Sequence, residues 1–227
     1  MIERRAERYV VFNADDFGFT SGINRGIVEA HRRGVVTSAS FMVTGGATEE
    51  AVELADAHPR LSVGLHWDAG PAGGRRLDLT DVAAIRRDFG DQLERFQQLF
   101  GRPPTHVDSH YHTHLDTSLL PLFGELVEPL DVPLRGNGRV KFVGSFFAAR
   151  GLRTVSVPWL QTLLQDGVGS GWTEIGCHPG YSEPGLSGYS SEREEELRTL
   201  TDARVRATVD DLGLRLVSYA DYPRFRS

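Results

Sequence analysis

Two adjacent carboxylates, Asp15 and Asp16, follow the apolar run YVVF over residues 9–12, which predicts a buried strand. A charge at the end of a buried strand must be paired or must bind a metal, because an isolated charge out of water is costly. Side chains alternate across a regular strand, so we expect different tasks for the two carboxylates: one binds a cation and the other faces a water molecule. An ordinary turn ending at Gly18 would explain the same residues.

Four further polar side chains, His66, His110, Arg135 and His178, stand at the ends of segments that have the pattern of strands. In a parallel α/β barrel the carboxyl ends of all strands lie on one rim, where active sites are built. Side chains far apart in the sequence would therefore meet there. Neutral imidazoles together with a carboxylate suit a divalent cation such as zinc, so the histidines favour the metal interpretation of the Asp-Asp pair.

Apolar periodicity divides the chain into alternating strands and helices. We expect strands over residues 8–14, 35–43, 61–66, 105–110, 132–135, 172–178 and 214–217. We expect helices over residues 21–33, 48–57, 81–100, 117–128, 155–164 and 191–212, the last with a capping box between Ser191 and Glu194. This alternation predicts parallel strands with crossover helices, and seven strands are one short of an eightfold barrel. Residues 136–151 follow no clear pattern, and residues 67–79 form a loop placed to cover a substrate.

The segment over residues 105–114 carries five polar residues at a spacing of two: His106, Asp108, His110, His112 and His114. An extended chain would put all five on one face. His110 stands on the expected rim, whereas His106 stands at the start of its strand, away from it. His112 and His114 fit either a solvated loop or a supporting role beside the site.

Cys177 directly precedes His178, which raises the question of a nucleophilic Cys–His pair. Such a pair needs the two side chains to touch, and neighbours on a regular strand point to opposite faces. We therefore expect Cys177 to pack as a small apolar residue, with Glu174 and His178 on the inward face.

The composition is that of a soluble globular protein: 227 residues, a net charge of -6 and 40% hydrophobic residues, with no electrostatic case for nucleic acid binding. No apolar run approaches the roughly 20 residues that a membrane helix needs. Strand-like sequence begins by Tyr9, which leaves no room for a secretory signal, and a single cysteine fits a reducing compartment. We therefore expect a cytoplasmic protein with no membrane partner; a homodimer is the commonest oligomer among soluble proteins.

Seven short motifs follow one another along the chain: NADDFG (13–18), INRGI (23–27), VTSAS (36–40), GLH (64–66), THVDSHYHTH (105–114), LR (134–135) and CHP (177–179). In this combination they resemble the YdjC-like carbohydrate deacetylases, the group that includes chitooligosaccharide and hopanoid-associated deacetylases. The resemblance runs nearly end to end, so residues 1–227 are expected to form a single domain. It implies a distorted TIM-like (β/α) barrel, similar to that of polysaccharide deacetylases.

The resemblance also implies roles for the rim residues. One divalent metal ion, Mg²⁺ or Zn²⁺, would be held by Asp16, His66 and His110. Three further residues would be catalytic: Asp15 as general base, His178 as general acid and Arg135 beside the carboxylates. An ordinary histidine pKa of about 6.5 suits the donation of a proton. The implied reaction is metal-dependent hydrolysis of an N-acetyl group from an amino sugar or short oligosaccharide.

After His66 the chain departs from the family pattern, with WDAG over residues 67–70 and a short loop. We expect Trp67 and His112 to contact the substrate, while the identity of the sugar stays open. Two other functions also stay open: a metal-dependent hydrolase of another ester or glycosidic bond, and a non-catalytic sugar-binding protein organised by a metal. A two-carboxylate glycosidase fits poorly, because adjacent residues are unsuited to flank a bond at about 5–9.5 Å.

Overall fold

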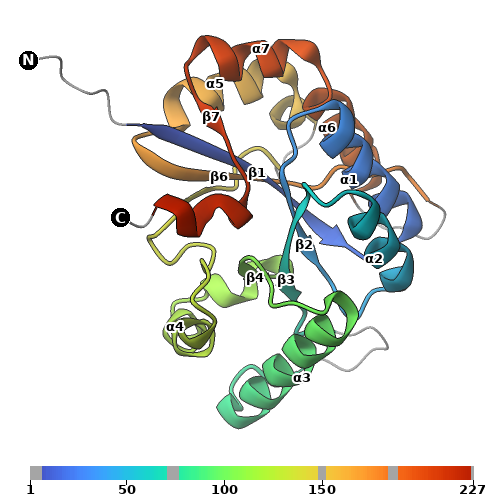
Figure 1. Ribbon diagram of the computed structural model, residues 1–227, viewed down its shortest axis with the longest axis vertical. Helices are drawn as coiled ribbons and strands as arrows, with labels where there is room; N and C mark the ends of the chain where they lie inside the picture. The colour runs from blue at the N-terminus through green and yellow to red at the C-terminus, as the bar shows by residue number, and fades with distance from the viewer. Residues whose placement is uncertain (1–6, 71–76, 148–151, 184–188, 226–227) are drawn as a thin grey trace, which may run out of the picture.

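A computed structural model describes residues 7–70, 77–147, 152–183 and 189–225. Within them, seven parallel strands form one sheet that curls into a half-barrel with helices around it (Figure 1). The strands are β1 (Arg8–Phe17), β2 (Ser38–Phe41), β3 (Ser62–Trp67), β4 (Val107–Ser109), β5 (Lys141–Val143), β6 (Gly171–Cys177) and β7 (Arg215–Leu216). Their order is β4-β3-β2-β1-β6-β5, and β7 pairs with β1. The predicted fold class is confirmed.

Strand β1 is the centre of the sheet, and its residues from Tyr9 to Phe17 are all buried. One edge of β1 pairs with β6 along residues 8–14. Tyr9 and Val10 also pair with β7, and residues 13–17 pair with β2 further along. A strand buried on both faces needs a continuous apolar run, which residues 9–12 supply. The polar residues that follow this run are therefore carried into the interior of the molecule.

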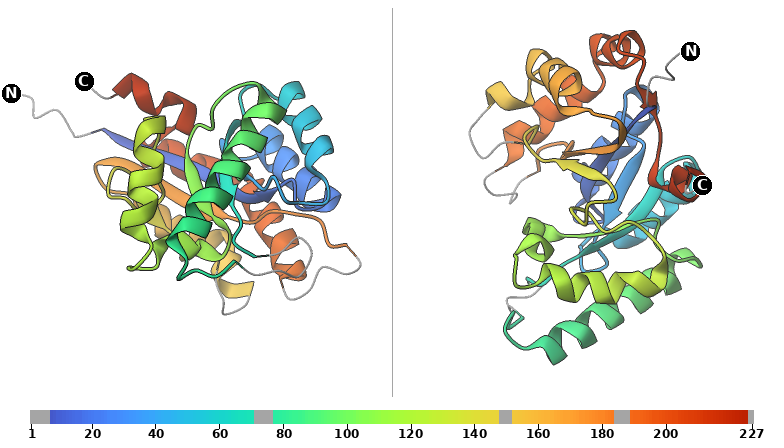
Figure 2. Two further views of the ribbon diagram at one scale, coloured as in Figure 1. Left: turned by 90° about the horizontal axis from the view of Figure 1, so that it is seen from below. Right: turned by 90° about the vertical axis from the view of Figure 1, so that its left-hand side faces the viewer.

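Helices flank the sheet: α1 (Ser21–Arg33), α2 (Thr48–Ala57), α3 (Val82–Phe100), α4 (Leu120–Val127), α5 (Val157–Gly167), α6 (Ser190–Leu200) and α7 (Ala203–Asp211). Side-chain caps begin three of them, from Thr20, Asp81 and Asp202. Figure 2 shows α3 and α4 side by side at one end of the molecule, with α5 and α7 at the other. Four 3₁₀-helices are also present among the described residues: η1 (His110–Leu115), η2 (Glu128–Leu130), η3 (Leu152–Val155) and η4 (Tyr219–Phe225).

Two predicted elements are wrong. The strand expected over residues 132–135 is reduced to a single bridge between Leu134 and Val107, and Pro133 cannot donate to a ladder. The fifth strand is instead β5, which lies in the segment that followed no clear pattern. The helix expected over residues 191–212 is divided, because the side chain of Asp202 accepts from the backbone N–H of Arg204 and begins a new helix.

The capping box predicted at Ser191 and Glu194 does not form either. The Ser191 hydroxyl donates to Glu192, and Glu194 accepts from the backbone N–H of Ser182. Of the loop expected over residues 67–79, residues 71–76 lie outside the described part of the chain. Among the described helices, none combines the length and the apolar character needed to span a membrane.

Candidate functional site

The Asp15-Asp16 pair lies at an irregularity in β1. The pairing of β1 with β2 shifts register between Ala14 and Phe17, and Asp16 adopts a left-handed backbone conformation with φ of 71°. Bulges of this kind re-aim side chains at strand ends and are frequent beside active sites. The alternation expected of a regular strand is broken here, and both carboxylates enter one buried cluster while keeping different partners.

Asp16 meets two histidines from distant segments. Its Oδ1 lies 3.1 Å from Nδ1 of His110 and 3.4 Å from Nε2 of His66. One ligand atom from each of the three residues lies within 4.8 Å of the others, a spacing that can hold a metal ion. Asp16 comes from β1, His66 from β3 and His110 from the start of η1, directly after β4. The predicted convergence of these three side chains is therefore present in the fold.

Hydrogen bonds to neighbouring side chains orient two of these three residues, His66 and Asp16. Nδ1 of His66 donates to Asp108 at 2.6 Å, and Arg193 of α6 donates to the second oxygen of Asp16 at 2.5 Å. A carboxylate behind a ligating histidine fixes the ring and raises its basicity, as metal sites commonly require. The atoms left facing each other are one carboxylate oxygen and two ring nitrogens, a donor set that fits a divalent cation.

Asp15, His66 and Asp108 form a second group with the spacing of metal ligands, but the carboxylate oxygens of this group already accept hydrogen bonds. The two oxygens of Asp15 accept from Arg135 at 2.6 and 2.8 Å. Those of Asp108 accept from His66 and from Ser40, the latter at 2.6 Å. Because their oxygens are already engaged, this second group serves as the support of the first.

Arg135 is the hub of that support and is 1% exposed. Besides Asp15 it contacts Asp108 at 2.7 Å and donates to Glu174 at 2.6 Å. The other oxygen of Glu174 accepts from the hydroxyl of Tyr219, again at 2.6 Å. Burial alone would lower the pKa of Arg135, but the three carboxylates raise it well above its usual value, so the guanidinium is always charged.

The charges of this buried cluster do not cancel. Four carboxylates surround the site, and two arginines face them: Asp15, Asp16, Asp108 and Glu174 against Arg135 and Arg193. With His66 and His110 neutral, as metal ligation requires, two negative charges are left over. A divalent cation would balance them, and buried charge of this kind requires a partner. The same excess acts on His66: burial lowers its pKa, but the Asp108 and Asp15 carboxylates raise it to about 10. The charge balance therefore supports the fit of a divalent cation to this donor set.

Asp15 stays ionised in this setting. Burial raises its pKa, but the Arg135 guanidinium outweighs that effect and holds the pKa below its ordinary value. Asn13 also donates to its Oδ1 at 3.0 Å. Its Oδ2 lies 3.8 Å from Nε2 of His178, the residue that directly follows β6. A charged carboxylate and an imidazole thus lie side by side next to the three-residue cluster.

His178 is held by α6 and by aromatic rings. Its backbone N–H donates to Glu196 at 2.5 Å, and its ring lies 4.5 Å from that of Phe147 and 5.8 Å from that of Tyr189. Burial lowers its pKa to about 4, so the ring is neutral at pH 7. The pKa of His178 therefore lies below the ordinary histidine value of about 6.5 that suits proton donation. A proton that His178 donates must first reach it during the reaction.

The remaining predicted site residues lie at different distances from the cluster. Nδ1 of His112 lies 3.3 Å from Nη1 of Arg135, and its ring contacts Phe142 and Phe147, which places it beside the cluster. Trp67 lies in the core: it is 0% exposed and its indole N–H donates to Asp88 at 2.9 Å. This position gives no support for substrate contact by Trp67.

The row of alternating histidines ends where β4 ends. Tyr111 and His112 both have φ of 54°, so the chain turns and the extended face predicted over residues 105–114 is broken. His114 is buried, with Ser109 at 2.6 Å and the backbone carbonyl of Arg135 at 3.1 Å, which fits a supporting role. His106 is also buried; its ring stacks on Tyr219 and packs where Gly64 has no side chain.

Cys177 is buried, as expected, and its thiol contacts the carbonyl of Asn13 at 3.3 Å. Asp108 and Arg193 were not assigned roles from the sequence. Asp108 carries a signal, since it stands in the same row as His106 and His110. Arg193 lies in the charged run SEREEE over residues 191–196, which has the composition of a solvent-exposed helix, so its burial could not be anticipated.

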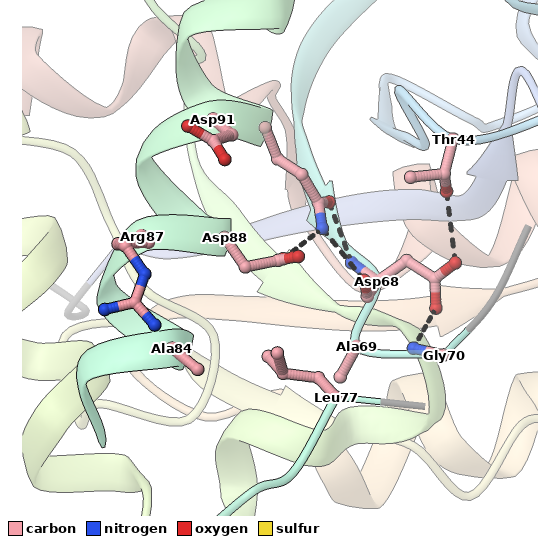
Figure 3. A pocket seen from close by; sticks show the side chains of 10 residues that line it. Thr44, Asp68, Ala69, Gly70, Leu77, Ala84, Arg87, Asp88 and Asp91 are labelled. Carbon is pink, nitrogen blue, oxygen red and sulfur yellow. Dashed lines mark hydrogen bonds between the residues drawn. The ribbon is translucent and has the colours of Figure 1, made fainter. Parts of the chain in front are cut away.

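Two cavities lie beside the loop after β3, and the first of them reaches the site. The first, of about 360 Å³, is bordered by Phe19, Met42, His110 and Tyr111. The second, of about 410 Å³, lies against α3 (Figure 3). Asp68 borders both, and its carboxylate accepts from Thr44 at 3.1 Å and from the backbone N–H of Gly70 at 3.0 Å. Open space thus reaches the His110 member of the cluster.

A parallel half-barrel with an Asp-His-His cluster at the carboxyl ends of its strands defines an α/β barrel with a candidate cation site. A model of the YdjC-like protein family matches residues 9–211, so this chain belongs to the YdjC-like family. A carbohydrate deacetylase of Geobacillus stearothermophilus is 36% identical over 248 residues, covering 95% of this chain and 98% of its own. A chitooligosaccharide deacetylase of Klebsiella pneumoniae is 32% identical, covering 95% and 99%.

Solved structures share the fold. A candidate cellobiose-phosphate cleavage protein of Enterococcus faecalis has a TM-score of 0.82 at 25% identity, covering 96% of this chain and 99% of its own. A family 4 carbohydrate esterase of Streptomyces lividans, solved with acetate, has a TM-score of 0.59 at 13% identity, covering 92% of each chain. The second likeness is one of fold alone.

Proposed function

We propose that this protein hydrolyses the N-acetyl group of an amino sugar or short oligosaccharide, with a divalent cation, Mg²⁺ or Zn²⁺, held by Asp16, His66 and His110. The observation that carries the proposal is the bulge in β1, which sets a charged carboxylate directly beside a three-residue cation cluster. The relatives named as carbohydrate and chitooligosaccharide deacetylases support the substrate class.

Amide hydrolysis needs an activated water molecule, stabilisation of the developing oxyanion and a proton for the departing amine. A bound divalent cation supplies a Lewis acid that polarises a carbonyl and lowers the pKa of water. The chain itself supplies the two proton-transfer groups. Arg135 and Asn13 hold Asp15 in one orientation, so that its carboxylate can accept a proton from the attacking water.

His178 completes the proton path. Its neutral ring can accept the proton through Nε2 from Asp15, 3.8 Å away in the resting site, and pass it to the amine nitrogen as the C–N bond breaks. The water proton taken by Asp15 thus leaves on the amine, and Asp15 returns to its charged state. Phe147 and Tyr189 border the ring and limit the access of bulk water to this path.

Two alternatives give different products. Cleavage of a glycosidic bond would release reducing sugar, and a non-catalytic sugar-binding protein would release nothing. The carboxylate pair is poorly suited to a glycosidase, because two adjacent residues are unsuited to flank a glycosidic bond at a separation of about 5–9.5 Å. The presence of both Asp15 and His178 disfavours the non-catalytic function.

The test begins with metal analysis of the purified protein. Acetate and reducing-sugar release are then measured over N-acetylated sugars, before and after treatment with a chelator. We expect acetate release that chelation abolishes and a divalent cation restores. Reducing sugar without acetate would favour the glycosidic alternative, and sugar binding without turnover in metal-loaded protein would favour the binding protein.

Two variants separate the assigned roles. Asp15→Asn should keep its metal and lose about 10²–10⁴-fold in kcat, the usual contribution of general acid–base catalysis. His110→Ala should weaken metal binding itself. A His110→Ala protein that binds metal as tightly as the unchanged protein would contradict the ligand assignment.

A further inference from the structure

Tyr111 is an exposed aromatic residue next to a member of the cation cluster. Its side chain is 82% exposed, more than any other large hydrophobic residue in the described part of the chain. It directly follows His110, and the centroids of the two rings lie 3.9 Å apart at an angle of 51°. An aromatic ring this exposed beside a candidate active site has a free apolar surface that a ligand can contact.

The backbone at Tyr111 is also strained. Both Tyr111 and the next residue, His112, have φ of 54°, a region that bulky side chains rarely adopt because of steric contact with the backbone. Strain of this kind persists where the surrounding structure imposes it, and it concentrates at ligand sites. At this turn the hydroxyl of Thr113 donates to the backbone carbonyl of His110 at 3.0 Å. The turn therefore keeps the ring in solvent at a conformational cost.

Two cavities border Tyr111. Tyr111 borders the cavity of about 360 Å³ that reaches His110, and a third cavity, of about 460 Å³, that reaches His112. Leu79 and Thr113 border both cavities as well. These volumes are within the range of small-molecule sites. Tyr111 thus borders two spaces that each extend to a histidine of the site.

The cavity of about 360 Å³ is lined by a carboxylate, Asp68, as well as by the aromatic ring of Tyr111. Asp68 is 7% exposed, and each of its carboxylate oxygens accepts one hydrogen bond within the protein, from Thr44 or from Gly70 (Figure 3). A carboxylate oxygen has a second lone pair, so both atoms can accept a further hydrogen bond. A flat apolar surface beside hydroxyl acceptors suits a pyranose ring, which has C–H groups on its faces and hydroxyls around its edge.

We propose that Tyr111 is the surface on which a pyranose ring of the substrate stacks, with Asp68 accepting hydrogen bonds from the hydroxyls of the sugar. The inference rests on the proposed function for the choice of a sugar as ligand. It assigns to this chain a contact that positions the sugar beside His110, separate from the residues that hold the cation or move protons.

The test compares Tyr111→Gly with Tyr111→Phe. Glycine removes the ring and tolerates positive φ, so the melting temperature should stay unchanged or rise, and metal affinity should not change. KM for an N-acetylglucosamine oligomer should rise by about fivefold, the size of one aromatic contact. Tyr111→Phe keeps the ring and should keep the KM of the unchanged protein. Tyr111→Asn, which also tolerates this conformation, serves if the glycine variant fails to fold.

Asp131→Gly is the matched control, because Asp131 has the same φ of 54° and borders neither cavity. It should change the melting temperature in the same direction and leave KM unchanged. An unaltered KM in Tyr111→Gly would overturn the proposal. A parallel fall of metal affinity and kcat, without a change in KM, would also overturn it, because Tyr111 would then only support His110.

Binding measured without turnover separates this inference from the proposed function. Ligand-observed NMR with N-acetylglucosamine oligomers should detect weaker binding to Tyr111→Gly than to the unchanged protein. If the unchanged protein binds these sugars through Tyr111 but releases no acetate, the stacking surface stands and the deacetylase function fails. Equal binding to both proteins would refute the stacking surface whatever the activity.

Discussion

The cation cluster and the surroundings of His178 are built from different parts of the fold. Asp16, His66 and His110 come from the ends of β1, β3 and β4, and a hydrogen bond between His66 and Asp108 links two of those strand ends. His178 is instead held by Glu196, and Arg193 reaches Asp16 from the same helix, α6. The first part is fixed by the register of the sheet, whereas the second depends on how one helix packs.

The comparison indicates where the site tolerates change. Sheet register cannot shift without disrupting every pair of neighbouring strands, so the cluster on the strands is expected to be the rigid part. Contacts from α6 can change with the packing of a single helix. Variants on the two sides should therefore differ in the size and the kind of their effects.

The largest effect is expected from Arg135→Met. Removing the guanidinium leaves Asp15, Asp108 and Glu174 buried without their cation, and breaking a buried ion pair costs about 3–5 kcal/mol. Denaturant unfolding measures this change. Arg86→Met, which removes the exposed ion pair with Glu125, is the control and should cost about 1 kcal/mol or less. Equal losses in the two variants would contradict the role of Arg135 as hub.

A smaller effect is expected from Asp108→Asn, which weakens the support behind His66 on the strand side. Metal affinity, measured by titration, should fall about 10–100-fold. Arg193→Gln tests the helix side in the same assay. Its effect should be smaller, because the loss of a contact that orients Asp16 is offset by the loss of a positive charge near the cation. A larger fall for Arg193→Gln than for Asp108→Asn would reverse the comparison.

The last predicted effect concerns the pH dependence of stability and involves contacts of α6 alone. Burial raises the pKa of Glu196 from 4.5 to about 7, so the folded state favours its neutral form. The stability that this group contributes is fully present below about pH 4.5 and is lost as the pH rises through about 7. Glu196→Gln should remove that part of the pH dependence, measured by denaturant unfolding between pH 4 and 8. The variant Glu195→Gln, at a half-buried neighbour in α6, should keep it, and identical pH profiles for all three proteins would contradict the assignment.

The same division explains how much of the site could be predicted from the sequence. Parallel topology alone brings the ends of β1, β3 and β4 to one rim, so His66 and His110 could be placed beside Asp16 from strand order. Arg193 could not, because its neighbours in α6 are mostly charged and periodicity does not show which of them turns inward. The substrate contact predicted for Trp67 is based on its position directly after His66. Strand β3 instead continues to Trp67, and the side chain of Trp67 is buried in the core.

Fold prediction failed where local chemistry outweighed periodicity. Residues 191–212 keep a helical pattern throughout, yet the side-chain cap of Asp202 divides them. Residues 132–135 have the apolar character of a strand, but Pro133 lacks the N–H that a ladder needs, and the sheet takes residues 141–143 instead. The bulge in β1 had no sequence signal beyond the two adjacent carboxylates themselves.

That bulge has a consequence for how the molecule works. Asp15, the proposed proton acceptor, and Asp16, the proposed cation ligand, are joined by a single peptide bond, so their Cα atoms stay about 3.8 Å apart. No hinge or loop closure is needed to bring these two residues together. Differences in sugar preference among family members must then arise in the segments around this fixed pair, where insertions can occur without disturbing it.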